Sequence, residues 1–582
     1  MQYGFVKTAA LTPSIRVADC AYNARQIIEV LRAAAAAGAE IACLPELCIT
    51  GYTCGDLFFQ PVLQQGARDA LADVLRDTAG LPLLFVLGLP LTHGGKLYNC
   101  AAVCQNGRVL GVVPKTHLPN YNEFYEKRQF TPAPAENGVI DLSGAQVPFG
   151  TNLLFQCGTQ PALTLAVEIC EDLWAPLPPS TRHAMAGATL ICNLSASDET
   201  IGKAEYRRAL VTGQSARLLC GYVYADAGEG ESTTDMVFAG HNMVAENGAL
   251  LAETAPFCGG MALTDIDVER LAGERLKNTS FPAEDSANYE VIPFVLPQNV
   301  SPLTRIVSSA PFVPADAEQR ARRCDAILAM QASGLKKRLE HTHAKTAVVG
   351  ISGGLDSCLA LLVTVRAFSL LERPLSDIVA VTMPCFGTTE RTRTNAQRLC
   401  EALGVTLQHV DITQTVRSNF ADIGQDEARH DVTYENTQAR VRTLVLMNLA
   451  NRLGGLVIGT GDLSELALGW ATYNGDHMSM YGVNASVPKT LIRHIVASVA
   501  DETESSALRQ VLRDILDTPV SPELLPAENG KISQQTEEIV GPYTLHDFFL
   551  YYAVRWGFSP AKVYYLARQA FAGEYTNAVL LK

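Results

Sequence analysis

This sequence of 582 residues has no apolar run long enough to cross a membrane and no N-terminal signal-peptide pattern. It lacks any excess of positive charge, since its formal net charge is −14, and this argues against broad binding to nucleic acid or to a membrane surface. A disulfide framework is also missing, because the 15 cysteines are odd in number and scattered, mostly in apolar runs. Such cysteine usage suits a reducing compartment, and we expect a cytoplasmic protein without nucleic-acid or membrane partners.

A zinc-binding pattern is also missing. Cys43, Cys48 and Cys54 lie close together, but no C-x-x-C pair or nearby histidine accompanies them, and we interpret them as small core residues. At 582 residues the chain is too long for a single hydrophobic core, and two large domains are expected.

Residues 1–275 form the first predicted domain. Strand and helix patterns follow one another there, and two Asn-Gly pairs between apolar runs, Asn106-Gly107 and Asn247-Gly248, predict β-hairpins. Strand–helix units mixed with hairpins indicate a mixed sheet. Their recurrence favours a pseudo-repeated sandwich covered by helices.

The second predicted domain covers residues 317–582. Before it, residues 276–316 are rich in proline, which predicts a linker that wraps one domain or the other. After an initial helix, strands and helices alternate, and this predicts a doubly wound parallel sheet. Ligands bind such sheets at the carboxyl ends of the strands, where Ser352, Pro384 and Thr460 fall.

Residues 352–357, which read Ser-Gly-Gly-Leu-Asp-Ser, carry the clearest functional signal. They follow a predicted buried strand at 347–351 and precede a helix pattern. A glycine turn at a helix start presents backbone N–H groups to an anion, and Asp356 beside a phosphate suits a Mg²⁺ ligand. The spacing is not that of a Walker loop. It resembles the pyrophosphate-binding loop of the ATP pyrophosphatases, which cleave ATP to AMP and pyrophosphate.

Two further predicted strand ends and the loop after them add candidates. Met383 is either an apolar surface for an adenine ring or a core methionine. Glu465, shortly after Thr460, could join Asp356 on one Mg²⁺, which commonly uses one or two carboxylates together with phosphate oxygens. Lys489 could neutralise ATP phosphates as charge moves onto the leaving pyrophosphate.

Several separated blocks resemble the NAD synthetases. Residues 435–442, 459–469 and 483–490 match that family, and residues 521–524 and 540–548 are similar to its glutamine-dependent members. The resemblance covers nearly the whole chain. It implies that ATP adenylates the nicotinate carboxylate of deamido-NAD and that ammonia then displaces AMP to give NAD. Adenylation is needed because a bare carboxylate repels nucleophiles and has no leaving group.

The resemblance also implies the residues of the synthetase site. ATP would be bound by Gly350, Ile351, Ser352, Gly353, Gly354, Leu355, Asp356, Ser357, Thr460 and Lys489. Deamido-NAD would be bound by Asn436, Glu465, Trp470, Ala471, Thr472 and Tyr473. Mg²⁺ would be bound by Asp356 and Glu465, and of the two roles implied for Glu465 the metal is favoured.

Three residues of the first domain resemble the catalytic triad of the nitrilase superfamily, namely Glu46, Lys115 and Cys170. In that role Cys170 attacks the amide carbon of glutamine, and Glu46 takes the thiol proton and later activates water. Lys115 stabilises the tetrahedral oxyanion. The implied fold is α/β, with an N-terminal αββα nitrilase-like sandwich and a C-terminal doubly wound parallel sheet of the adenine nucleotide alpha hydrolase-like type.

Tyr121, Ser197 and Lys203 match positions that hold glutamine in the family. Lys203 stands where an arginine is often found, so a bidentate clamp on the glutamine carboxylate would be lost there.

Two alternatives stay open. One is a nitrilase-type amidase fused to a different ATP pyrophosphatase, such as a GMP-synthetase-like or argininosuccinate-synthetase-like domain, although the blocks after Asn436 argue against it. The other is a chain that only binds or oligomerises. The family usually continues with a basic segment beyond the point where residues 579–582 end this chain, so we expect retained glutaminase chemistry and weakened affinity for deamido-NAD. The resemblance further implies a homo-oligomer. Because NH₃ that escapes is protonated and lost, we also infer an ammonia tunnel between the two sites, one that crosses subunits.

Overall fold

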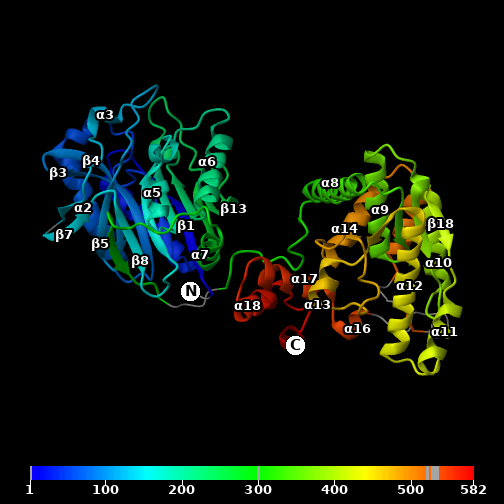
Figure 1. The fold of residues 1–582 in the computed structure, drawn as a ribbon. Helices are drawn as coiled ribbons and strands as arrows, with labels where there is room; N and C mark the ends of the chain where they lie inside the picture. The colour runs from blue at the N-terminus through cyan, green and yellow to red at the C-terminus, as the bar shows by residue number, and fades with distance from the viewer. Residues whose placement is uncertain (1–2, 143, 298–301, 519–523, 526–535) are drawn as a thin grey trace. The chain divides into compact units, whose positions relative to one another are not determined.

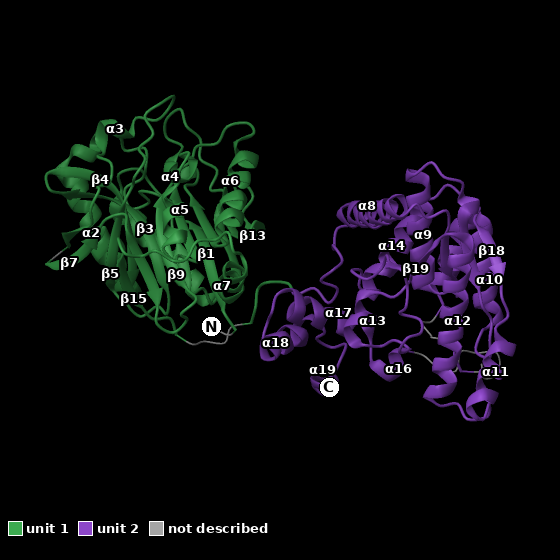
Figure 2. Cartoon of the chain, in the orientation of Figure 1, with its two compact units in different colours: residues 1–306 green, residues 307–582 purple. Residues whose placement is uncertain are grey.

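The computed structural model of the chain describes residues 3–142, 144–297, 302–518, 524–525 and 536–582. The chain forms two compact units, Met1–Ile306 and Val307–Lys582, drawn in green and purple in Figure 2. Of the family-like block at 521–524, only Leu524 lies within the described residues. In the described ranges, no helix combines the length and the apolar character needed to span a membrane.

The first unit contains two large β-sheets (Figure 1). The eight-stranded sheet has the order β14 (Gly260–Asp267), β1 (Phe5–Thr12), β2 (Ile41–Cys43), β3 (Leu84–His93), β4 (Lys96–Gln105), β5 (Arg108–Pro114), β7 (Ala145–Phe149), β6 (Gly138–Leu142). The seven-stranded sheet has the order β13 (Ala249–Glu253), β12 (Met243–Glu246), β11 (Gly221–Asp226), β10 (Leu190–Ser195), β9 (Thr164–Ile169), β8 (Leu153–Cys157), β15 (Glu290–Phe294). Parallel pairing of β2 with β1 and β3, and of β10 with β9 and β11, brings the carboxyl ends of these strands together.

The two sheets pack face to face around one core, which contains Val6 and Val86 from one sheet and Val167 and Val223 from the other. The outer face of the eight-stranded sheet is covered by α1 (Cys20–Ala36) and α2 (Pro61–Thr78). The outer face of the seven-stranded sheet is covered by α5 (Pro179–Met185) and α6 (Lys203–Leu218). These layers are the predicted αββα sandwich, which confirms the fold class of this unit. Its shorter helices are η1 (Gly55–Phe59), α3 (Glu126–Gln129), α4 (Glu171–Trp174), η2 (Glu229–Glu231) and α7 (Val268–Lys277).

Local sequence signals account for several of these elements. α1 buries one face at i, i+3, i+4 and i+7 spacing, and its N-cap Asp19 accepts the N–H of Tyr22 at 3.0 Å. Both predicted hairpins are present, because Asn106-Gly107 joins β4 to β5 and Asn247-Gly248 joins β12 to β13. All four turn residues have positive φ, which asparagine and glycine adopt most easily.

The predicted linker at 276–316 is only partly a linker. β15 lies within it and pairs in parallel with β8 at the edge of the seven-stranded sheet, a position where Pro293 is tolerated. Further along, the Arg305 guanidinium donates to both carboxylate oxygens of Glu246 at 2.8 and 3.1 Å. The boundary between the packed units therefore falls after Ile306, later than the expected limit at 275.

The second unit is built on a five-stranded sheet with the order β18 (Thr406–His409), β17 (Ile378–Thr382), β16 (Ala347–Gly350), β19 (Leu456–Gly459), β20 (Tyr481–Gly482). Each of these pairings is parallel. The helices are α8 (Ala317–Thr342), α9 (Leu355–Leu370), α10 (Glu390–Leu403), α11 (Thr413–Ile423), α12 (Val432–Leu453), α13 (Leu463–Leu468), α14 (Lys489–Glu502), α15 (Ser506–Leu516), α16 (Thr536–Val540), α17 (Tyr543–Phe549), α18 (Pro560–Ala570) and α19 (Asn577–Leu581). A 3-10 turn spans Leu375–Asp377 and a π-helical turn spans Leu550–Arg555.

Alternation along β16 shows that helices cover both faces of this sheet. Ala347 and Val349 belong to the core that contains Leu359 of α9 and Ile492 of α14. Val348 points to the opposite core, which includes residues of α11 and α12. The doubly wound parallel sheet is thereby confirmed, and its strands end beside the residues proposed for ligand binding.

Candidate active sites

Cys170 lies in a sharp turn between β9 and α4. Its backbone has φ 44° and ψ −98°, a strained conformation for a residue with a Cβ, and strain of this kind is frequent at functional sites. The Cys170 N–H donates to the carbonyl of Leu194 at 2.9 Å and to Oδ1 of Asn193 at 3.2 Å. Because both acceptors belong to β10, the neighbouring strand holds the turn in place.

Glu46 follows β2 in a loop that lies directly on β3. A Cβ on Gly88 of β3 would stand 2.2 Å from the backbone N of Leu47, so only glycine fits there. The Glu46 carboxylate accepts the N–H of Ala196 at 3.0 Å and the Nδ2 of Asn99 at 2.7 Å. These contacts fix the orientation of the carboxylate.

Lys115 follows β5 and is buried between two carboxylates. Its Nζ lies 2.6 Å from Oε1 of Glu46 and 2.6 Å from Oε1 of Glu126. Burial alone would lower the pKa of Lys115, but the charges of Glu126 and Glu46 hold this pKa well above its ordinary value. Burial also raises the pKa of Glu126 to about 7. Lys115 is therefore a buried ammonium group.

Electrostatics link these residues to Cys170. Burial is the main cause that holds the pKa of the Cys170 thiol well above its ordinary value, and the charge of Glu46 raises it further while Lys115 lowers it. The resting thiol is therefore protonated and needs a base before it can act as a nucleophile. This arrangement can supply a nucleophile, a base and a cation for a developing oxyanion.

Glu126 and Asn99 were not among the predicted residues. Glu126 lies in the four-residue helix α3, too short to show a hydrophobic period, and Glu123 nearby is indistinguishable from it in sequence. Asn99 lies within the buried strand β4. A polar residue in this mostly apolar run was the sequence signal that could have marked it as a site residue.

The residues expected to hold glutamine surround the same turn. Tyr121 donates its hydroxyl to Oε1 of Glu171 at 2.9 Å. Lys203 forms an ion pair with Asp198, which already engages part of its charge. Ser197 directly precedes Asp198 in the sequence, and its N–H donates to Oδ1 of Asp226 at 2.9 Å.

Arg207 of α6 supports the Ser197–Asp198 segment from the interior. It is fully buried and donates to Oε2 of Glu199 at 2.9 Å, to Oγ of Ser197 at 3.3 Å and to the carbonyl of Asp198 at 3.3 Å. A lone arginine in a helix pattern gave no sequence signal for this role. The guanidinium thus orders the loop that carries Ser197.

A cavity of about 230 Å³ lies at the strand ends of the second unit. The predicted ATP residues that line it are Gly350, Ile351, Ser352, Asp356, Ser357 and Thr460. Glu465 and Ala471, both predicted for deamido-NAD, line it as well. Met383 belongs to the cavity wall and to the adjoining core, and its contact with an adenine ring stays a prediction.

The remaining predicted residues of this unit do not line the cavity. Gly353, Gly354 and Leu355 form the turn into α9, where Gly353 has φ 84° and a Cβ would stand 2.1 Å from the carbonyl O of Thr392. Asn436 is half-buried on α12. Four more predicted residues lie outside the cavity lining, namely Lys489, Trp470, Thr472 and Tyr473.

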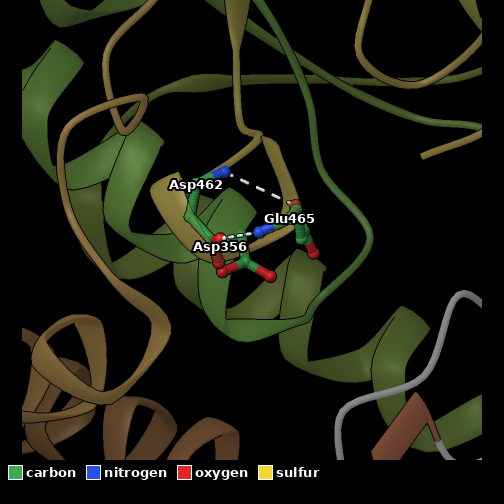
Figure 3. A group of neighbouring side chains, drawn as sticks. All are labelled: Asp356, Asp462 and Glu465. Carbon is green, nitrogen blue, oxygen red and sulfur yellow. Dashed lines mark hydrogen bonds between the residues drawn. The ribbon is translucent and has the colours of Figure 1, made fainter. Parts of the chain in front are cut away.

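Three carboxylates gather at the edge of this cavity, from Asp356, Asp462 and Glu465 (Figure 3). Lys489 Nζ lies among them, 2.7 Å from Asp356, 2.7 Å from Asp462 and 2.9 Å from Glu465. Asp462 also forms a capping box with Glu465, and a D-x-x-E pattern after a strand was the signal that could have revealed it. In this state Lys489 contacts carboxylates, not the cavity where phosphates were expected.

The donor set of this cluster fits Mg²⁺. Burial, then the charge of Asp356, raises the pKa of Glu465 to about 8 and that of Asp462 to about 6, and a bound cation would oppose both shifts. Among the described residues, Oδ1 of Asp356 is buried without a hydrogen-bond partner. Carboxylate oxygens beside a phosphate-binding turn are the ligands that Mg²⁺ prefers.

Comparisons with known proteins agree with this division into two sites. A family model described as carbon-nitrogen hydrolase matches residues 7–275, and one described as NAD synthase matches residues 327–555. The class of protein is therefore one that joins an amide-hydrolysing unit to a nucleotide-dependent synthase unit. The glutamine-dependent NAD(+) synthetase of Mycobacterium tuberculosis strain H37Rv is 45% identical over 586 residues, covering 98% of this chain and 86% of the relative. The chain belongs to the family of glutamine-dependent NAD(+) synthetases.

More distant matches carry the same name. The glutamine-dependent NAD(+) synthetase of Thermotoga maritima is 28% identical over 562 residues, covering 96% of this chain and 90% of the relative. A solved structure of the Acinetobacter baumannii glutamine-dependent NAD+ synthetase with ADP matches 99% of this chain and 92% of that chain at 22% identity and a TM-score of 0.39.

Proposed function

We propose that this chain makes NAD from deamido-NAD, ATP and glutamine, with release of AMP, diphosphate and glutamate. The observation that supports this proposal is that one chain of this family contains two separate clusters of reactive side chains. One is the cluster of Glu46, Lys115 and Cys170, and the other is the carboxylate cluster beside the 352–357 turn. The first makes ammonia and the second uses it.

In the first unit, Cys170 Sγ attacks the amide carbon of glutamine while Glu46 accepts the thiol proton. Lys115 stabilises the negative oxygen of the tetrahedral intermediate. When the C–N bond breaks, Glu46 returns the proton to the departing nitrogen, which leaves as NH₃. Glu46 then takes a proton from the water that attacks the thioester, and glutamate is released.

Recognition of the amino-acid end of glutamine falls to Tyr121, Ser197 and Lys203. Lys203 would offer a single cationic contact to the glutamine carboxylate, because its ammonium is shared with Asp198. A lysine cannot form the two parallel hydrogen bonds of a guanidinium.

In the second unit, the turn at 350–357 and Thr460 bind ATP, with Met383 against the adenine. Asn436, Glu465 and residues 470–473 bind deamido-NAD, whose carboxylate attacks the α-phosphorus and displaces diphosphate. Asp356 and Glu465 would hold Mg²⁺, which neutralises phosphate charge when bound. Lys489 then meets the charge that develops on diphosphate, and NH₃ displaces AMP from the adenylate.

A product assay tests this proposal. Deamido-NAD, ATP and glutamine should give NAD, AMP and glutamate in equal amounts, as measured by chromatography. If xanthosine monophosphate were aminated in place of deamido-NAD, a different ATP pyrophosphatase activity would be established. The homo-oligomer implied by the family resemblance is tested separately by light scattering.

A further inference from the structure

A fully buried chain of polar side chains runs away from the backbone of Cys170 across three neighbouring strands. Asn193 Oδ1 accepts the Cys170 N–H at 3.2 Å, and Asn193 Nδ2 donates to the hydroxyl of Tyr222 at 3.1 Å. The Tyr222 hydroxyl donates to Oε1 of Glu168. Oε2 of Glu168 accepts the N–H of Ser180 at 2.8 Å. The side chains of Asn193, Tyr222 and Glu168 are at most 1% exposed.

The direction of these hydrogen bonds follows from the two backbone N–H groups, of Cys170 and Ser180, that donate to the two ends of this row of side chains. The Cys170 N–H can only donate, so the amide atom of Asn193 that faces it must be oxygen. The Asn193 NH₂ group therefore faces Tyr222, whose hydroxyl proton must point to Glu168. At the far end, the Ser180 N–H makes the second Glu168 oxygen an acceptor. Both oxygens of the Glu168 carboxyl group thus accept hydrogen bonds.

Cys170 needs such support because its turn is strained, with φ 44° and ψ −98°. Its N–H is shared between the Leu194 carbonyl and Asn193, and Asn193 Oδ1 also accepts the hydroxyl of Ser195 at 2.7 Å. Ser195 ends β10, and its carbonyl accepts the Glu46 N–H at 3.4 Å. One amide oxygen thus ties the nucleophile turn to the strand end that contacts the catalytic base.

We propose that Glu168, Tyr222 and Asn193 form one positioning relay that orients the Asn193 amide and thereby fixes the backbone of Cys170 for attack on glutamine. The proposal rests on the role of Cys170 given above. None of the three residues needs to touch glutamine or ammonia. Glu168 and Tyr222 act through Asn193. Removing the Tyr222 hydroxyl takes away one acceptor of the Asn193 NH₂ group and loosens the hold on the amide.

A double-mutant cycle in the full-length chain tests the relay. Tyr222→Phe should lower the glutamine-dependent kcat about tenfold, the loss of roughly one buried hydrogen bond, while the KM for glutamine stays within about twofold. Asn193→Leu should lower kcat further. The double variant should equal Asn193→Leu alone, because Tyr222 has no route to Cys170 without Asn193. The rate of Cys170 alkylation by iodoacetamide should fall in parallel.

Tyr289→Phe is the matched control. It removes a tyrosine hydroxyl of the same unit that bonds His183 at 2.9 Å, outside the relay, and should leave kcat unchanged. Ammonia-dependent NAD formation should stay at the wild-type rate in every variant. A wild-type kcat in Tyr222→Phe, additive effects in the double variant, or a change in KM alone would each overturn the relay.

The cycle also separates the relay from the function on which it rests. If the wild-type chain releases no glutamate from glutamine, or Cys170→Ala still does so, the proposed glutaminase fails. If the wild type is active and the relay variants match it, the relay alone fails. If Tyr222→Phe does not fold, Asn193→Leu decides the matter, and an alkylation rate like that of the wild type refutes the relay.

Discussion

The substitution Gly88→Ala, which adds a single carbon atom, tests how the first unit positions Glu46, the proposed catalytic base. A Cβ added by Gly88→Ala would stand 2.2 Å from N of Leu47, 2.6 Å from O of Pro45 and 2.8 Å from C of Glu46. These are backbone atoms, so no side-chain rotation relieves the clash. To reach ordinary contact distances the Glu46 loop must move by about 1 Å, at an overpacking cost of about 1–3 kcal/mol.

A displacement of this size is large for catalysis, since a 1 Å misplacement can lower a rate about 100-fold. We therefore expect the glutamine-dependent kcat to fall by about two orders of magnitude. NAD formation from ammonium chloride should be unchanged, because the altered residue lies in the first unit. Steady-state NAD formation with the two nitrogen sources measures both quantities on one preparation.

Gly213→Ala is the control substitution. Gly213 lies inside α6, and an added Cβ there has no neighbour within 4 Å, so alanine should stabilise the helix by up to about 1 kcal/mol without changing either activity. Glutamine-dependent activity in Gly88→Ala equal to that in Gly213→Ala would refute the argument that Gly88 positions Glu46.

Three further outcomes are expected. Gly353→Ala, whose Cβ would stand 2.1 Å from the carbonyl O of Thr392, should lower NAD formation from both nitrogen sources while glutamate release persists. Glu126→Gln removes a carboxylate that pairs with Lys115 and should lower the glutamine-dependent kcat at least about tenfold, with ammonia-dependent synthesis intact. His183 has a pKa lowered to about 4 by burial, against about 6.5 when unfolded. Its stabilising contribution, roughly 3 kcal/mol, is present above pH 6.5 and lost as the pH falls from there to 4. Urea unfolding at pH 4.5 and 7 measures this loss, which His183→Gln should abolish.

Much of the fold could be predicted from local patterns. The two Asn-Gly pairs predicted their hairpins because few other residues adopt positive φ so readily. The alternation of strands and helices after residue 340 predicted the doubly wound sheet. β15 was missed because Pro293 favours a loop, and only the position of this strand at a sheet edge makes proline acceptable.

The candidate sites were predictable where a residue stands at a strand end. Glu46, Lys115 and Cys170 follow β2, β5 and β9, so strand ends bring them close together. Glu126 and Asp462 were missed for different reasons. Glu126 lies in a single helical turn, and its proximity to Lys115 is a tertiary contact. Asp462 has the sequence pattern of a helix cap. That pattern explains the residue without its other contact, the ion pair with Lys489, so the ion pair could not be predicted.

The central claim is that two separate sites divide the reaction, with Cys170 serving only the release of ammonia. NAD formation by Cys170→Ala, with glutamine and then with ammonium chloride as nitrogen source, tests it most directly. The account predicts that glutamine-dependent formation is abolished and that ammonia-dependent formation keeps the wild-type rate. Equal loss with both nitrogen sources, or retained use of glutamine, would contradict it.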